Sequence, residues 1–86
     1  MSYYYSTQNI IVHFKTIIGK TYTTRININS TLLTLKQEFK KLDGISPERL
    51  SLSCNGKRLD NDDKTLREYG LYDNCILRMA LHLRGG

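Results

Sequence analysis

The last six residues, Leu81-His82-Leu83-Arg84-Gly85-Gly86, form the stretch whose residue types are best suited to chemistry. Two terminal glycines bury no side chain and are costly to order, so they are a poor end for a packed domain. They do place a carboxylate on a backbone that can enter a narrow cleft and adopt φ values closed to other residues. The pattern indicates a carboxyl group that is meant to be joined to another molecule, with a frayed terminus as the alternative.

The residues before the two glycines provide contacts for a partner protein. Leu81 and Leu83 are apolar anchors, and Arg84 carries a guanidinium that can make paired, charge-assisted hydrogen bonds. The sequence therefore predicts a tail that is read by a partner and reacts at Gly86.

The rest of the chain lacks the groups that would make it a catalyst. Its cysteines and histidines are Cys54, Cys75, His13 and His82. Both cysteines lie in strand-like patterns with no evident base, and the histidines have no ligand spacing. Asp60, Asp62 and Asp63 lack the spacing and glycine of a calcium loop, so a solvated turn is expected there. We expect no catalytic residue, no metal site and no enzymatic activity.

Composition describes a small soluble protein. The chain has 86 residues, 40% of them apolar and 24% charged, which fits one domain with one core. No apolar run approaches the ~20 residues of a membrane span, and no secretory signal begins the chain. We expect a monomer with free thiols in the cytoplasm, and also in the nucleus. The net charge of +5 is spread along the chain without aromatic interleaving, which favours basic docking patches over a nucleic-acid site.

The elements that must position the tail follow in order. Residues 1–9 read as a polar, tyrosine-rich leader. Residues 10–17 and 21–28 alternate as a hairpin. The apolar spacing of Leu32, Leu35, Phe39 and Leu42 predicts one amphipathic helix, with cap candidates at 29–31 and an end at Gly44. Strands are expected at 50–54, 57–59 and 75–81, with an Asn55-Gly56 turn and a single helical turn over 65–69.

From residue 10 onward the chain resembles the ubiquitin family. The resemblance is carried by short motifs in register: Lys15-Thr16, Gly19-Lys20-Thr21, Gly44-Ile45-Ser46-Pro47, Gly56-Lys57-Arg58-Leu59, Thr65-Leu66-Arg67-Glu68-Tyr69 and Leu83-Arg84-Gly85-Gly86. It implies an α+β, β-grasp fold, with a mixed sheet of about five strands, one α-helix packed across it and a short 3-10 turn. The implied layout is a flexible extension over 1–9, the domain over 10–82 and an exposed conjugation tail over 83–86.

The resemblance also implies a function, that of a protein modifier. An activating enzyme would adenylate the Gly86 carboxylate with ATP, conjugating and ligating enzymes would pass it to lysines of target proteins, and deconjugating proteases would remove it. Gly85 and Gly86 would be the acyl donor, and Leu81, His82, Leu83 and Arg84 the segment that the enzymes read. The protein itself would bind no cofactor.

Two other functions stay open. One is a non-covalent docking module, which a chain continuing past Gly86 would favour and an end at Gly86 argues against. The other is a sulfur carrier, which would bear sulfur on its carboxyl group instead of forming an amide with lysine.

Several positions depart from the family pattern. His82 stands where an arginine is read by the activating enzyme, and histidine is mostly uncharged at pH 7. The expected partner-binding surface consists of Ile17, Ser53 and Ala80 in place of leucine, isoleucine and valine, with Ile45 in a second apolar patch beside Leu81 and Leu83. Ser53 should weaken partners that require an isoleucine by roughly 1 to 2 kcal/mol. Leu42 and Leu50, in place of polar residues, are expected in the core.

Lysines at matching positions suggest where chains could form. They are Lys57, Lys20, Lys36 and Lys15, whereas Asp73 replaces another. Matching a lysine does not establish that it is used.

Overall fold

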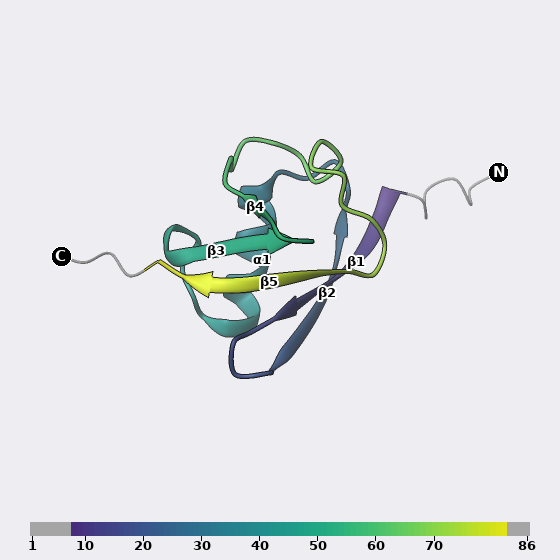
Figure 1. Ribbon diagram of the computed structural model, residues 1–86. Coiled ribbons are helices and arrows are strands. Elements are labelled where there is room, and N and C mark those ends of the chain that lie inside the picture. Colours follow the sequence, from purple (N-terminus) through teal and green to yellow (C-terminus); the bar gives the residue numbers. More distant parts are fainter. Residues whose placement is uncertain (1–7, 83–86) are drawn as a thin grey trace.

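The computed structural model describes residues 8–82 and contains one mixed sheet crossed by one helix (Figure 1). The strands are β1 (Asn9–Lys15), β2 (Thr21–Asn27), β3 (Leu50–Cys54), β4 (Lys57–Leu59) and β5 (Cys75–Leu81). Their order in the sheet is β2-β1-β5-β3-β4. β1 and β5 run parallel and the other pairs antiparallel. The predicted fold class is confirmed, and β5, which leads into the tail, lies at the centre of the sheet.

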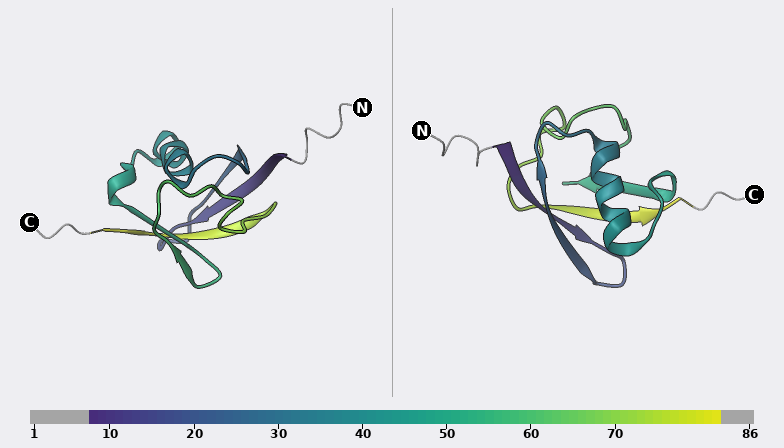
Figure 2. Two further views of the ribbon diagram at one scale, coloured as in Figure 1. Left: turned by 90° about the horizontal axis from the view of Figure 1, so that it is seen from above. Right: turned by 180° about the vertical axis from the view of Figure 1, so that it is seen from behind.

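The helix α1 (Leu32–Asp43) begins and ends where the sequence predicts. Thr31 caps it with a side-chain oxygen that accepts a hydrogen bond from the Thr34 N–H at 3.2 Å. At the other end Gly44 has a φ of 85°, a left-handed conformation that disfavours a β-carbon, and its N–H bonds the Lys40 carbonyl. α1 covers one face of the sheet and leaves the other open (Figure 2). Within residues 8–82, no helix is long and apolar enough to cross a membrane.

The core lies between α1 and the sheet, because alternate residues of each strand point toward the helix. Every second residue of β1 is buried, namely Ile10, Val12 and Phe14. Phe14 and Phe39 of α1 are both fully buried, with ring centroids 4.7 Å apart. Burial of these large side chains supplies most of the stability that a domain of this size can gain.

The short connections are tight turns. The predicted helical turn over residues 65–69 is a hydrogen-bonded turn, and the 3-10 helix lies elsewhere in the chain. Asn55 and Gly56 have φ values of 54° and 80°, as the two-residue hairpin turn requires. The 3-10 helix is η2 (Pro47–Arg49), immediately before β3. Residues 65–70 form a hydrogen-bonded turn in which the Tyr69 N–H reaches the Thr65 carbonyl at 3.2 Å.

The expected burial of Leu42 is wrong. Leu42 is 42% exposed, whereas Leu50 is fully buried. Leu42 is the last residue but one of α1, whereas Leu50 begins β3, whose alternate residues Leu50, Leu52 and Cys54 are all buried. The periodicity of a helix gives the side on which a residue lies but not whether the sheet extends beneath it.

The N-terminal boundary lies slightly earlier than the predicted start of the first strand. β1 begins at Asn9, and the Gln8 carbonyl accepts a hydrogen bond from the Ile28 N–H at 2.7 Å. The Gln8 side chain also accepts one from Asn29 Nδ2 at 2.9 Å. Residues 1–7 of the predicted leader lie outside the described residues.

Candidate functional site

The reactive end of the predicted tail, Leu83, Arg84, Gly85 and Gly86, lies outside the described residues. The structure describes the two residues that precede it, Leu81 and His82, which we call the root of the tail. Leu81 ends β5, and the His82 N–H donates a hydrogen bond to the Arg49 carbonyl at 2.7 Å. The chain therefore leaves the sheet from its central strand, held on one side by the segment that precedes β3.

An apolar groove of about 490 Å³ lies beside this root; we call it the tail groove. Its walls come from the turn between β1 and β2, the end of α1 and the end of β5. The lining residues are Thr16, Ile17, Ile18, Lys20, Tyr22, Asp43, Ile45, Met79, Ala80 and Leu81. A hollow of this size with apolar walls is suited to binding side chains of a partner protein.

The groove exists because the pairing of β1 with β5 stops early. Their parallel register ends at Lys15 opposite Arg78, so the last residues of β5 have no backbone partner on that side. The β1–β2 turn stands there instead. Its two isoleucines, Ile17 and Ile18, are 86% and 81% exposed. Adjacent isoleucines this exposed gain nothing for the fold, and an exposed apolar patch is typical of an interaction site.

Polar side chains also line the groove, namely Lys20, Tyr22 and Asp43. The Tyr22 hydroxyl donates a hydrogen bond to Asp43 at the end of α1. The Lys20 amine lies 5.0 Å from the centre of the Tyr22 ring. Hydrogen bonding to Tyr22 raises the pKa of Lys20 above its ordinary value.

The structure brings most of the predicted partner surface together. Ile17, Ala80 and Ile45 all line the tail groove with Leu81, so residues predicted in two separate patches share one hollow. Ser53 does not line it. Ser53 lies on β3 opposite Arg78, on the face of the sheet that α1 leaves open.

Sequence reasoning missed five residues of the groove, namely Thr16, Ile18, Tyr22, Asp43 and Met79, and it gave Lys20 only as a linkage lysine. Tyr22 and Met79 lie within the predicted strands 21–28 and 75–81. Met79 is buried in the core and Tyr22 packs against it, and strand alternation alone does not show that both also reach the groove. Ile18 lies in the connection between the predicted strands 10–17 and 21–28. The signal that marks it is a β-branched apolar residue immediately before a turn glycine, where polar residues are usual.

The candidate linkage lysines differ in accessibility. Lys15, Lys20 and Lys57 are exposed. The Lys36 side chain is 8% exposed, and its amine lies 2.9 Å from Asp62 Oδ1. Lys36 would have to leave this ion pair and the surface of the core before its amine could react.

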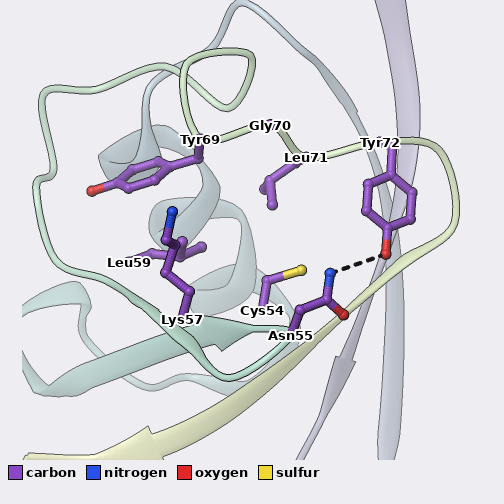
Figure 3. A pocket seen from close by; sticks show the side chains of 8 residues that line it. All are labelled: Cys54, Asn55, Lys57, Leu59, Tyr69, Gly70, Leu71 and Tyr72. Carbon is purple, nitrogen blue, oxygen red and sulfur yellow. Dashed lines mark hydrogen bonds between the residues drawn. The ribbon is translucent and has the colours of Figure 1, made fainter.

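Lys57 lies at a second hollow, of about 260 Å³ (Figure 3). The turn after β3 and the segment before β5 form this hollow, whose residues are Cys54, Asn55, Lys57, Leu59, Tyr69, Gly70, Leu71 and Tyr72. Asn55 Nδ2 donates to the Tyr72 hydroxyl at 3.4 Å, and the Tyr69 hydroxyl accepts from the Asn61 N–H at 2.7 Å. These contacts hold the two sides of the hollow together around the lysine.

Both cysteines are free and buried. Burial raises the pKa of Cys54 and of Cys75 above the ordinary value of 9.0, and the nearby Cys54 adds to the rise at Cys75. Thiols with raised pKa values are poor nucleophiles at neutral pH. Within residues 8–82, no three His, Cys, Asp or Glu side chains are grouped to hold a metal ion.

These raised values predict a pH dependence of stability. The thiols ionise in the unfolded chain near pH 9 but resist ionisation when folded, so the free energy of unfolding should fall as pH rises above about 9. Below that pH their contribution should be constant. Urea unfolding of the protein and of a Cys54→Ala, Cys75→Ala variant, each from neutral to alkaline pH, checks this. The variant should lose less stability over the interval; equal losses would show that the thiols play no part.

Comparison with known proteins identifies relatives of the whole domain. The family model described as the ubiquitin family matches residues 12–84. The chain is 31% identical over 75 residues to the NEDD8-like protein RUB3 of Arabidopsis thaliana, covering 87% of this chain and 95% of that protein. It is 26% identical to rat ubiquitin D over 68 residues, 79% of this chain, and spans only 42% of that protein. With the AN1-type zinc finger protein 4 of mouse it shares 26% identity over 96% of this chain but 11% of that protein.

Solved structures show the same fold. The ubiquitin-like domain of an Arabidopsis thaliana protein, determined by NMR in solution, superposes with a TM-score of 0.81 at 24% identity, over 86% of this chain and 78% of that one. A designed protein based on ubiquitin gives a TM-score of 0.81 at 26% identity, over 91% of this chain and 94% of the design.

Proposed function

Because this chain belongs to the ubiquitin family, we propose that it is a protein modifier, joined through its Gly86 carboxylate to lysines of target proteins. The observation that carries the proposal is the tail groove, an apolar hollow at the root of the tail. A partner enzyme that must place a flexible carboxylate in its active site needs a fixed surface next to it. The groove provides that surface within a few residues of the reacting group.

The chemistry belongs to the partners. A carboxylate oxygen of Gly86 attacks the α-phosphate of ATP, releasing pyrophosphate and forming an acyl adenylate. An enzyme cysteine thiolate then displaces AMP and forms a thioester, and a target amine displaces that thiolate to form the amide. Adenylation gives the carboxyl group a good leaving group, and the thioester and then the amide each form from a more reactive acyl derivative. This chain contributes the acyl group and the docking surface, and acts in the cytoplasm or nucleus without a bound cofactor.

The match to a relative over nearly its whole length supports a free-standing modifier. The chain covers 95% of the NEDD8-like protein at 31% identity, so all but a few residues of that relative have a counterpart here.

A non-covalent docking domain is the second candidate. It is favoured by the relatives of which the chain spans 42% and 11%, where a ubiquitin-like segment is part of a longer protein. The tail groove would serve such a domain as well, since docking does not require the carboxylate.

Intact mass spectrometry of a reconstituted reaction distinguishes the protein modifier from the non-covalent docking domain. The protein is incubated with ATP, magnesium and activating enzymes for ubiquitin and for NEDD8-like proteins, including those of its source. A thiol-labile adduct with an activating enzyme supports the modifier, and the enzyme that forms it shows what His82 selects. A folded protein that gives no adduct with any of these enzymes would contradict it.

The groove predicts a specific defect in this reaction. Ile17→Asp should leave the fold intact, because Ile17 is 86% exposed, yet place a charge where a partner buries an apolar side chain. We expect adduct formation at limiting concentration to fall about tenfold or more, from lost apolar burial of about 1.5 kcal/mol or greater. Gln37→Asp, on the exposed side of α1 and outside the groove lining, is the control with the same charge change. Equal activity of the two variants would show that partners do not use the groove.

A further inference from the structure

The open face of the sheet carries a row of cations. Lys15 of β1 lies opposite Arg78 of β5, Arg78 lies opposite Ser53 of β3, and Ser53 lies opposite Arg58 of β4. These four residues sit side by side on consecutive strands, and the three cations are exposed. Figure 1 looks onto this face, with α1 behind it. We call Lys15, Arg78 and Arg58 the cationic row; with strands about 4.8 Å apart it is about 14 Å long.

No carboxylate balances the row within the sheet. None of the five strands contains an Asp or Glu. The ion pairs of residues 8–82 are Lys36 with Asp62 and Lys41 with Glu38, and both lie away from the row. Asp73, in the segment before β5, accepts a hydrogen bond from the Ile11 N–H at 2.8 Å, four residues along β1 from Lys15.

Such an arrangement is unfavourable for the isolated fold. Like charges directly opposite each other on neighbouring strands repel, and Lys15 and Arg78 are such a pair. On the side of the row toward the end of β5, the neighbouring residues Ser51 and Ala80 are small and leave the cations accessible. A partner that places negative charges on the cationic row would relieve the repulsion between its side chains.

We propose that the open face binds an extended, acidic segment of a partner protein, with carboxylates lying along the cationic row. The guanidinium groups of Arg78 and Arg58 match carboxylates in a paired geometry, and the Ser53 hydroxyl between them can donate a further hydrogen bond. An extended segment advances about 3.3 Å per residue, so alternate side chains over about five residues span the row.

A nucleic acid is a poorer match to the same charge. Proteins that bind single strands combine cations with aromatic platforms for the bases. The strand positions that face away from α1 hold no Phe, Tyr or Trp: they are Asn9, Ile11, His13, Lys15, Thr21, Thr23, Arg25, Asn27, Ser51, Ser53, Arg58, Ile76, Arg78 and Ala80. The face therefore offers charge and a flat surface without stacking. This inference does not depend on conjugation, since a modifier and a docking domain would both expose the row.

Fluorescence anisotropy with a labelled peptide of alternating Glu and Ser tests the proposal. The whole protein is compared with two double variants of equal charge change. One removes two cations of the row, Arg58→Gln with Arg78→Gln; the other removes two exposed cations of α1, Lys40→Gln with Lys41→Gln. Thermal unfolding establishes that both are folded. We expect the first variant to bind about tenfold more weakly and the second to stay within about twofold of the original.

Three outcomes would overturn the proposal. The original protein could fail to bind the peptide at low salt. Both variants could weaken binding equally, which would mean that net charge alone attracts the peptide. A labelled oligouridylate could bind more tightly than the peptide and depend on the same arginines, which would assign the row to nucleic acid.

Discussion

Deleting Gly86 should abolish thioester formation with an activating enzyme, lowering the yield at least about a hundredfold. The shortened chain still ends in a glycine carboxylate, so the chemistry of the group is unchanged. The position of that carboxylate does change, because one residue of extended chain is about 3.3 to 3.6 Å long. A partner that grips the tail groove holds the root fixed, and the reacting atoms then stop short of attack distance. Misplacement by about 1 Å is already worth a factor of about 100.

Ser2→Ala, in the N-terminal segment, is the matched control for this deletion and should form the adduct normally. Urea unfolding of the deletion variant should match that of the original protein. If the shortened chain formed the adduct as fast as the original, the register between groove and carboxylate would not matter, and the proposed role of the groove would be wrong.

Phe39→Ala should lower the free energy of unfolding by about 3 to 5 kcal/mol. Phe39 is fully buried where α1 crosses the sheet, 4.7 Å from the Phe14 ring and 5.4 Å from the Tyr22 ring, measured between centroids. Its removal leaves a cavity and breaks both aromatic contacts. Small domains have about 5 to 15 kcal/mol in total, so much of the stability would be lost. Because Tyr22 also lines the tail groove, the groove should loosen with the core.

Gln37→Ala is the control for Phe39→Ala, since Gln37 lies on the exposed side of the same helix. It should change the free energy of unfolding by no more than about 0.5 kcal/mol. Urea unfolding followed by circular dichroism measures both. A loss below about 1 kcal/mol for Phe39→Ala would contradict the packing described for the core.

Much of the fold follows from patterns that short-range physics enforces. The two-residue alternation of Ile10, Val12 and Phe14 places these side chains on one face of β1 wherever the strand lies. The ends of α1 were predictable because Thr31 and Gly44 satisfy or relax local backbone groups. The Asn55-Gly56 turn was predictable for the same reason, since both residues tolerate positive φ.

The site was less predictable, because it depends on which strands become neighbours. The exposure of Ile17 and Ile18 follows from the end of the β1–β5 register at Lys15, which no local pattern encodes. The burial of Lys36 needs Asp62, which lies 26 positions further along the sequence. The cationic row is invisible along the chain, because Lys15, Arg58 and Arg78 meet only through the strand order of the sheet.

The central claim, that the Gly86 carboxylate becomes joined to lysines, is tested most directly by the bond itself. A tagged form of the protein, expressed in cells of its source, is purified under denaturing conditions and digested after lysine. Cleavage after Lys64 leaves residues 65–86 attached to any modified lysine, a branch long enough to identify this protein. We predict peptides that carry this branch through Gly86, and none when Gly86 is deleted. Recovery of the intact protein without any such branched peptide, from cells that contain its activating enzyme, would contradict the account and leave non-covalent docking in its place.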